Sequence, residues 1–276
     1  MENAISLQVL FKELPQLSAP MLTGMGARAS KAFKEVTYDF PADTTVAGAG
    51  YATFGTHKVK FDFVKHPIPD KYRATIVDHI HTSAEIAGLV EDHAAYIELS
   101  YEGEETDPIA KYCILTALGS MLSTQDALVL ANCNSHCALN AAKLLCMFAG
   151  KDWMESIQQL PLVYLFCGAA AYDVPNDDSK VWLRTHGNHM LNIPDIGAEF
   201  DVSQHEELVP QALETFETLM GYMNALGVPI APGHTVEGST MMITVKEKPT
   251  ATGEIYDAPS GLLTLAFSPK PVSTSI

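Results

Sequence analysis

Basic residues are scarce in this sequence. It contains 17 lysines and arginines against 33 aspartates and glutamates, which gives a formal net charge of −16. A surface with so little positive charge repels a phosphate backbone or an anionic bilayer, so we expect neither nucleic acid nor a membrane as a partner. The surplus of carboxylates is explained either by solubility or by recognition of a basic partner.

The sequence also lacks a long apolar run and a secretory leader. No apolar stretch approaches the roughly 20 residues that cross a bilayer. The start Met1-Glu2-Asn3-Ala4 has neither the basic nor the apolar part of a signal peptide. The five cysteines are an odd number set mostly in apolar surroundings, which is typical of reduced, buried thiols. We therefore expect a cytoplasmic protein.

Common catalytic and cofactor motifs are missing. There is no G-x-S-x-G nucleophile pattern and no G-x-x-x-x-G-K-[ST] phosphate loop. Cys133, His136 and Cys137 have the residue types of zinc ligands, but no second cysteine pair follows, and packing after a buried strand explains them as well. The sequence therefore predicts no catalytic residue, no metal and no cofactor.

The most clearly delimited part of the sequence is residues 181–245. VWLRT at 181–185 and the apolar run AEFDV at 198–202 precede a long amphipathic segment that stops at Gly227. Ser203 and Glu206 form the S-x-x-E pattern of a capping box, and Gly227 is typical of a helix end. Pro210 does not suit a helix interior, so either the first turn is a separate piece or the helix begins near this proline.

Apolar alternation and turn residues divide the rest of the chain into further elements. The expected strands are residues 6–11, 45–64 with a hairpin turn at 55–57, 93–101, 127–131, 162–167, 241–245 and 262–267; the expected helices are 20–33, 71–90, 107–122 and 139–148. Several strands are joined by tight turns without a crossover helix. This favours an α+β fold with a mixed, largely antiparallel sheet and packed helices. The similar order of elements in both halves suggests two similar lobes, 1–150 and 161–276, within a single domain of residues 1–276.

Acidic residues gather in two predicted loops that follow strands. Their carboxylates are Glu102, Glu104, Glu105, Asp107, Asp173, Asp177 and Asp178. Acidic loops more often simply face solvent, but such residues can also complement a basic protein surface. They are the partner-binding residues that the sequence predicts. His186, His189 and His234 lie in polar loops at strand ends, where ligand pockets commonly form.

Several turn and core motifs are similar to those of a known family. They are VWLRTHG at 181–187, NIPDIGAEF at 192–200, GHTVEG at 233–238, HPIPD at 66–70 and HAAYI at 93–97. Through these motifs most of the chain resembles the bacterial domain-of-unknown-function family 4261, with a family-like module at 181–245. Where such proteins usually have a medium-sized apolar residue, this chain has Asn188-His189. The resemblance brings no catalytic residues. It implies a bacterial accessory protein, and some members lie beside secreted polymorphic toxins, which implies an immunity role.

Two functional hypotheses follow from these observations. The first is a cytosolic immunity protein, an antitoxin that binds a cognate toxin or secretion-system effector with a basic surface and occludes it through the acidic loops. The alternative is a small-molecule enzyme or sensor with a polar pocket lined by His186, His189 and His234. An oligomeric structural protein is a third reading. The sequence leaves the toxin's identity and the oligomeric state open.

Overall fold

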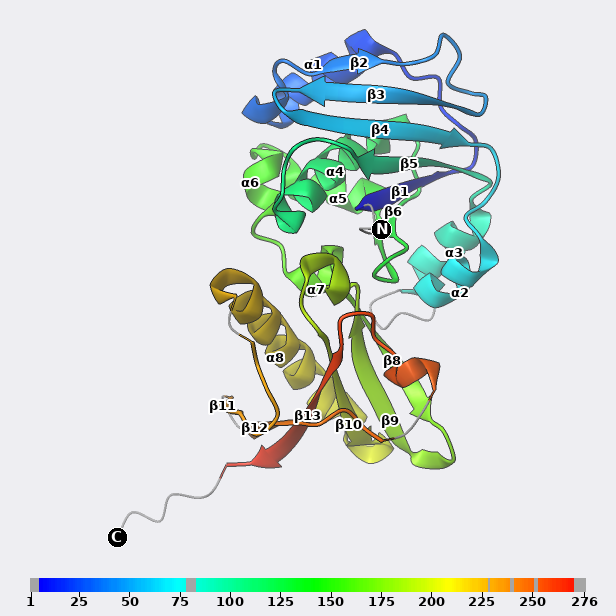
Figure 1. Ribbon diagram of the computed structural model, residues 1–276. Coiled ribbons are helices and arrows are strands. Elements are labelled where there is room, and N and C mark those ends of the chain that lie inside the picture. Colours follow the sequence, from blue (N-terminus) through cyan, green and yellow to red (C-terminus); the bar gives the residue numbers. More distant parts are fainter. Residues whose placement is uncertain (1–4, 78–82, 228, 239–240, 251–252, 271–276) are drawn as a thin grey trace. The chain divides into compact units, whose positions relative to one another are not determined.

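The chain divides into two compact units. The structure, a computed structural model, describes residues 5–77, 83–227, 229–238, 241–250 and 253–270, with the backbone alone at 164, 165, 205 and 254. Unit 1 is Met1–Phe166 and unit 2 is Cys167–Ile276, so the boundary lies a few residues inside the second expected lobe (Figure 1). Both units combine helices with mostly antiparallel strands, which confirms the predicted α+β fold.

Unit 1 is built on a seven-stranded sheet within the described residues, with the strand order β2-β3-β4-β5-β1-β6-β7 and every neighbouring pair antiparallel. Its strands are β1 (Ser6–Phe11), β2 (Thr37–Asp39), β3 (Gly48–Phe54), β4 (His57–Val64), β5 (Ala95–Tyr101), β6 (Val129–Asn132) and β7 (Cys137–Asn140). The expected hairpin between β3 and β4 is confirmed, and Gly55 at its turn has a φ of 54°. Such a positive φ favours glycine because it has no Cβ.

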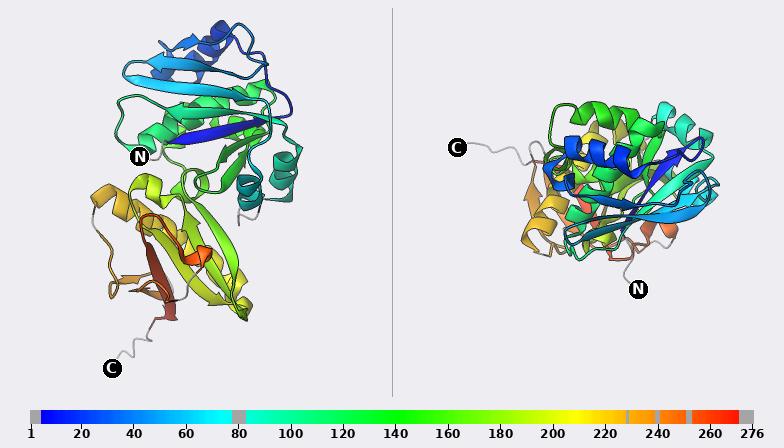
Figure 2. Two further views of the ribbon diagram at one scale, coloured as in Figure 1. Left: turned by 45° about the vertical axis from the view of Figure 1, so that its right-hand side comes forward. Right: turned by 90° about the horizontal axis from the view of Figure 1, so that it is seen from above.

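One face of this sheet is covered by α4 (Pro108–Leu122), and every α4 residue from Tyr112 to Leu122 is buried. The helix is apolar on nearly all sides, as expected for a helix enclosed by other elements. It contacts β1, β5 and β6, and α1, α5 and α6 pack around it (Figures 1 and 2). The remaining elements of this group are α1 (Ala19–Ala29), η1 (Lys31–Phe33), η2 (Ser123–Gln125), α5 (Ala141–Phe148), α6 (Trp153–Ile157) and α7 (Leu162–Leu165).

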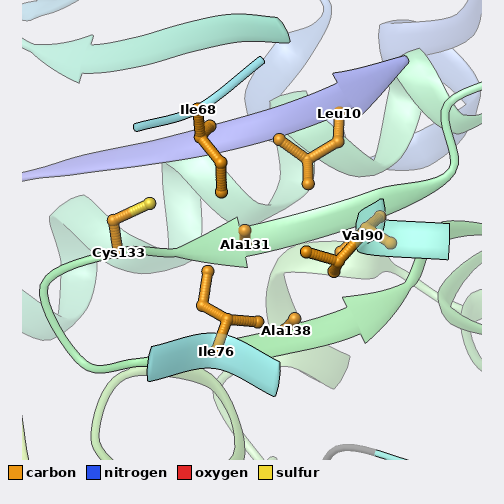
Figure 3. Close-up of a cluster of buried hydrophobic side chains, with 8 residues drawn as sticks. Leu10, Ile68, Ile76, Val90, Ala131, Cys133 and Ala138 are labelled. Atoms are coloured by element: carbon orange, nitrogen blue, oxygen red, sulfur yellow. The ribbon is translucent and has the colours of Figure 1, made fainter. Parts of the chain in front are cut away.

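The opposite face of the same sheet is covered in part by α2 (Asp70–Val77) and α3 (Ala84–Asp92). Ile76 and Val90 from these helices pack against Leu10 and Ala131 of the sheet in a buried cluster (Figure 3). The strands alternate accordingly, with β4 and β5 buried at every second residue and half-buried between. Part of this face, over β4, β5 and the start of β1, is therefore polar.

His93 fixes the chain segment that leads into α2. Its side chain is buried, its Nδ1 bonds the carbonyl of Val90, and its Nε2 accepts the N–H of Ile68 at 2.9 Å. Burial lowers the pKa of His93, and the N–H of Ile68 can be accepted only by a ring nitrogen without a proton. His93 is therefore a neutral structural link between the end of α3 and residues 67–69.

Unit 2 is built on a six-stranded sheet in the part of the chain that is described, with the order β11-β12-β13-β10-β9-β8. The β10–β13 pair is parallel and the others are antiparallel. Its elements are β8 (Gly168–Val174), β9 (Asp177–His186), η3 (Asn188–Leu191), β10 (Asp195–Asp201), η4 (Val202–Gln204), α8 (His205–Leu226), β11 (Thr235–Glu237), β12 (Met241–Lys246), η5 (Glu254–Tyr256) and β13 (Leu262–Pro269).

The two faces of this sheet are covered by different elements. The long helix α8 packs on β9 and β10 and buries its apolar stripe, which includes Phe216 and Met220. On the other face Trp182 packs against Tyr256 of η5, with ring centroids 5.2 Å apart. The indole Nε1 donates to the carbonyl of Ile255 at 3.1 Å, so the segment around η5 is fixed to the sheet.

Four local predictions are wrong at the element level. Residues 162–167 form the short helix α7 followed by a non-helical Phe166 and Cys167, and no strand, because periodicity cannot separate a short buried helix from a strand. The expected helix 71–90 is two helices, α2 and α3, with residues 78–82 outside the described ranges. Residues 139 and 140 belong to β7, and α5 begins after Asn140, whose side chain accepts the N–H of Lys143 at 3.0 Å.

The fourth concerns the start of α8. Ser203 lies in η4, and the residue at the helix start is Gln204, which makes no side-chain capping bond. The chain enters α8 from a tight turn with Gln204 already near helical φ and ψ, so the extended geometry that a capping serine needs is missing. The helix then runs continuously through Pro210 to Leu226, and Gly227 ends it with a φ of 60° as predicted.

Membrane-spanning length was also assessed for the described helices. None of them is both long enough and apolar enough to cross a bilayer.

Candidate functional site

The first predicted acidic loop lies in unit 1 between β5 and α4. Glu102 pairs with Lys58 of β4 at 3.1 Å, and Asp107 caps α4 by accepting the N–H of Ile109 at 3.0 Å. The Glu105 carboxylate accepts the backbone N–H groups of Asp107 and Thr106, which lowers the pKa of Glu105. Three of these carboxylates thus have local structural contacts, while Glu104 is exposed.

The second predicted acidic loop is the tip of a β-hairpin in unit 2. Strands β8 and β9 stay paired up to Val174 and Asp177, so the expected loop 173–178 shrinks to a turn at Pro175-Asn176. Asn176 has a φ of 65°, which asparagine tolerates better than most residues. Asp173 and Asp178 are exposed, and Asp177 accepts the hydroxyl and N–H of Ser179, which lowers its pKa. All three therefore present charge at or beside this tip.

Strand pairing brings further carboxylates to the same end of unit 2. Val181 of β9 pairs with Asp173 on one side and with Phe200 of β10 on the other. The end of β8, the start of β9 and the end of β10 therefore lie at one level of the sheet, and α8 begins there after η4 (Figures 1 and 2). We call this region the acidic end, and its carboxylates are Asp173, Asp177, Asp178, Asp201, Glu206 and Glu207.

The acidic end has little positive charge to balance it. Residues 168–226 contain ten aspartates and glutamates but only two basic residues, Lys180 and Arg184. Lys180 bridges Asp201 at 3.0 Å and Glu199 at 3.5 Å, and Arg184 is buried. Over the whole of unit 2 there are 14 acidic against 5 basic residues, compared with 19 against 12 in unit 1. The negative charge of the protein is thus concentrated in unit 2.

Part of this charge also stabilises the fold. Glu206 and Glu207 lie in the first turn of α8, where the helix dipole favours negative side chains. Both are exposed, as are Asp173, Asp178 and Asp201. A local role for two of them therefore leaves the charged surface accessible to a partner.

The three predicted histidines are not brought together. The backbone of His234 pairs with Val245 of β12, and β12, β13 and β10 lie between His234 and β9, which ends at His186. Four strand spacings put His234 roughly 19 Å from β9. His186 accepts or donates a bond of 2.7 Å with the hydroxyl of Tyr172, and His189 is half-buried in η3. One pocket lined by all three histidines is therefore excluded.

A buried ion pair lies beneath this part of unit 2. Arg184 donates to Asp195 at 2.9 Å, and the two side chains are 3% and 2% exposed. Arg184 also donates to the carbonyl of Ile255 at 3.0 Å. Burial raises the pKa of Asp195 although Arg184 opposes the rise, and burial lowers the pKa of His189. The pair has the contacts of a structural link between the sheet and η5, because breaking such a pair leaves an isolated buried charge.

Metal and nucleophile chemistry find no support in the described residues. No group of three or more histidine, cysteine, aspartate or glutamate side chains is placed to hold a metal ion there. Cys133 and Cys137 are buried, and burial raises their pKa values to about 12 and about 11. These thiols are therefore protonated at neutral pH and poor ligands or nucleophiles.

Sequence reasoning found the hairpin carboxylates of the acidic end but missed Asp201, Glu206 and Glu207. Those three were assigned to a strand end and a helix start, and their neighbourhood to residues 173–178 depends on the β8-β9-β10 register. A signal was nevertheless present, because no lysine or arginine occurs from Thr185 to Val245 while eight acidic residues do.

Comparison of the chain with known proteins gives no relative from which a function could be transferred. No family model, no curated protein and no solved structure matches it. The resemblance to the domain-of-unknown-function family 4261 therefore stays a prediction, and the geometry of the chain itself carries the functional argument.

Proposed function

We propose that this protein is a cytosolic binding protein that recognises a basic protein partner through the acidic end of unit 2, and that it acts as an immunity protein for a bacterial toxin. The observation that carries the proposal is the gathering of six carboxylates from β8, β9, β10 and α8 in a region whose exposed basic residue, Lys180, is already paired. A dense negative surface accelerates encounter with a positive one and fixes its orientation.

The chemistry of the partner follows from this surface. A toxin that acts on nucleic acid or on anionic substrates carries a basic cleft, and an acidic protein that covers such a cleft excludes the substrate. The resemblance of residues 181–245 to family 4261 supports the same role. The loop of unit 1 enters the proposal as a second contact region through Glu102 and Glu104, while Glu105 and Asp107 mainly hold the loop and α4 in place.

The test compares two full-length variants with the same change in charge. The first neutralises the acidic end with Asp173→Asn, Asp178→Asn, Glu206→Gln and Glu207→Gln. The control neutralises four exposed carboxylates of unit 1 with Glu13→Gln, Glu35→Gln, Asp126→Asn and Glu155→Gln. Asp177 and Asp201 are kept because each has a local contact.

Both variants are used to capture partners from the native cell and are co-expressed with toxins encoded beside the gene. We expect the wild type and the control to capture a basic protein and to protect cells, with binding that weakens as salt is added. The acidic-end variant should lose both properties. Equal capture and protection by the two variants would rule out the acidic end as the contact surface, and capture of no basic protein by the wild type would rule out the function. A third variant, Glu102→Gln with Glu104→Gln, measures the share of the unit 1 loop.

A further inference from the structure

Unit 1 contains a cavity of about 240 Å³ between α2 and the polar part of its sheet. It is lined by side chains from β1, β5 and α2 and from the segments before α2 and after β6. Since one water occupies about 30 Å³ in the liquid, the cavity has room for about eight waters or for an organic molecule of a few heavy atoms. The acidic end lies in unit 2, so this cavity is independent of the function proposed above.

One wall of the cavity is polar and held in place. Gln8 is 6% exposed and donates from Nε2 to the carboxylate of Glu98 at 3.1 Å, while its Oε1 accepts the backbone N–H of Cys133 at 3.1 Å. The hydroxyl of Ser6 also accepts from Gln8, at 3.3 Å. The amide of Gln8 is therefore fully engaged and orients Glu98, whose carboxylate retains further acceptor positions.

The other wall is apolar and aromatic. Ile68 and Cys133 belong both to the cavity lining and to the buried cluster under α2 and α3, where they lie on one side (Figure 3). Tyr72 from α2 and Tyr96 from β5 add two half-buried rings. Burial raises the pKa of Tyr96, with the charge of Glu98 adding to the effect, so its phenol is neutral at physiological pH.

The carboxylate in this cavity has no cationic partner among the described residues. Lys60 lies on the neighbouring strand of the same face but pairs with Asp62 at 2.8 Å, and Asp62 is the residue directly opposite Glu98. The ammonium of Lys71 lies 4.5 Å from the ring centre of Tyr72, so a cation can approach that ring. Glu98 thus keeps a negative charge beside two aromatic rings, which also attract cations.

We propose that this cavity binds a small primary alkylammonium ion. Its N–H groups would donate to the carboxylate of Glu98 and to the hydroxyl of Ser6, and its short alkyl chain would contact Ile68 and the rings of Tyr72 and Tyr96. An anion is repelled by Glu98, and a neutral molecule of the same size gains only the apolar contacts. His93 positions the site by holding the N–H of Ile68 at 2.9 Å.

The test uses the full-length protein and n-butylammonium chloride as the probe. Backbone amide signals are followed by NMR during titration, with n-butanol as the neutral probe and sodium butyrate as the anion. We expect saturable shifts around Gln8, Tyr72 and Tyr96 with butylammonium. Glu98→Gln, which keeps the acceptor for Gln8, should weaken binding at least about tenfold, because a charge-assisted hydrogen bond is lost.

The matched control is Asp62→Asn, which removes the facing carboxylate outside the cavity lining and should leave the affinity nearly unchanged. Tyr72→Leu is a second variant, on the half-buried helix side, and should weaken butylammonium more than butanol. The proposal is overturned if butanol or butyrate binds as tightly as butylammonium, if Glu98→Gln and Asp62→Asn have equal effects, or if no saturable shift occurs around the cavity.

Discussion

Gly197 shows how a single missing side chain shapes unit 2. The indole of Trp182 lies flat over this residue of β10, and a Cβ at position 197 would lie only 2.7 Å from Cη2 and closer still to Cζ2. Trp182 is 1% exposed, and its indole is fixed from the other side by Tyr256 and the carbonyl of Ile255. The ring therefore has no room to move away from a methyl group.

We predict that Gly197→Ala destabilises unit 2 by about 1–3 kcal/mol through overpacking. Urea unfolding followed by tryptophan fluorescence measures the loss. Gly221→Ala is the control, because a Cβ at this position of α8 would meet nothing within 4 Å. Removing glycine from a helix should there stabilise the protein by about 0.5–1 kcal/mol. Equal effects of the two substitutions would contradict the close contact of Trp182 with β10.

His93 provides a prediction about pH at the same scale. Its pKa is lowered in the folded protein by burial, so on acidification the unfolded chain takes up a proton before the folded chain does. The stability that depends on neutral His93 is therefore complete above the ordinary histidine pKa of about 6.5 and is lost as the pH falls below it.

We expect the unfolding free energy of the wild type to decrease between about pH 7 and pH 5, by up to about 1.4 kcal/mol per pH unit from this residue. His93→Gln should flatten the curve relative to the wild type, in urea titrations across this range. His66→Gln, at an exposed position near the same segment, is the control. Parallel curves for the wild type and His93→Gln would show that His93 has no part in the acid sensitivity.

Local punctuation accounts for most of what the sequence predicted at the scale of elements. Asp107 and Pro108 begin α4, and Gly227 ends α8, because capping and positive φ depend on neighbouring residues alone. Residues 162–167 were assigned wrongly because a short apolar run fits both a buried strand and a helix, and only tertiary packing decides. The acidic end was found in part, since strand register joins residues about 30 positions apart, which no local pattern contains.

Pro210 is the residue of α8 that local rules would not place there. The helix continues through it, although proline offers no N–H to the carbonyl of Glu206 one turn earlier. The side chain of Pro210 is exposed, so it adds little to the core. Pro210→Ala should therefore stabilise the protein by about 1–3 kcal/mol by restoring the missing hydrogen bond and relieving the ring contact.

Thermal and urea unfolding test this prediction, with Asn224→Ala as the control at another exposed position of the same helix. That substitution changes helix propensity alone and should gain less than about 1 kcal/mol. A loss of stability in Pro210→Ala would mean that the proline sets a bend on which the packing of α8 against β9 and β10 depends.

At the scale of the whole molecule, each unit has its own sheet and its own buried core, but the charge is unevenly shared. Unit 1 has 166 residues with 19 acidic and 12 basic side chains, and unit 2 has 110 residues with 14 and 5. Like charges on a compact body repel one another and lower its stability. The repulsion per residue is therefore greater in unit 2.

We predict that residues 1–166 and 167–276 fold when produced separately, and that salt stabilises the second fragment more than the first. Raising the salt from about 10 mM to about 150 mM shortens the screening length from about 30 Å to about 8 Å, which removes most of the long-range repulsion between exposed carboxylates. Circular dichroism establishes folding, and urea unfolding at both salt concentrations measures the gain. Neutralising Asp173, Asp178, Glu206 and Glu207 in the second fragment should reduce its salt response, because these exposed side chains contribute four of its 14 negative charges. An unchanged response would mean that the repulsion arises elsewhere in unit 2, and a fragment that stays unfolded would show that its core depends on the other unit.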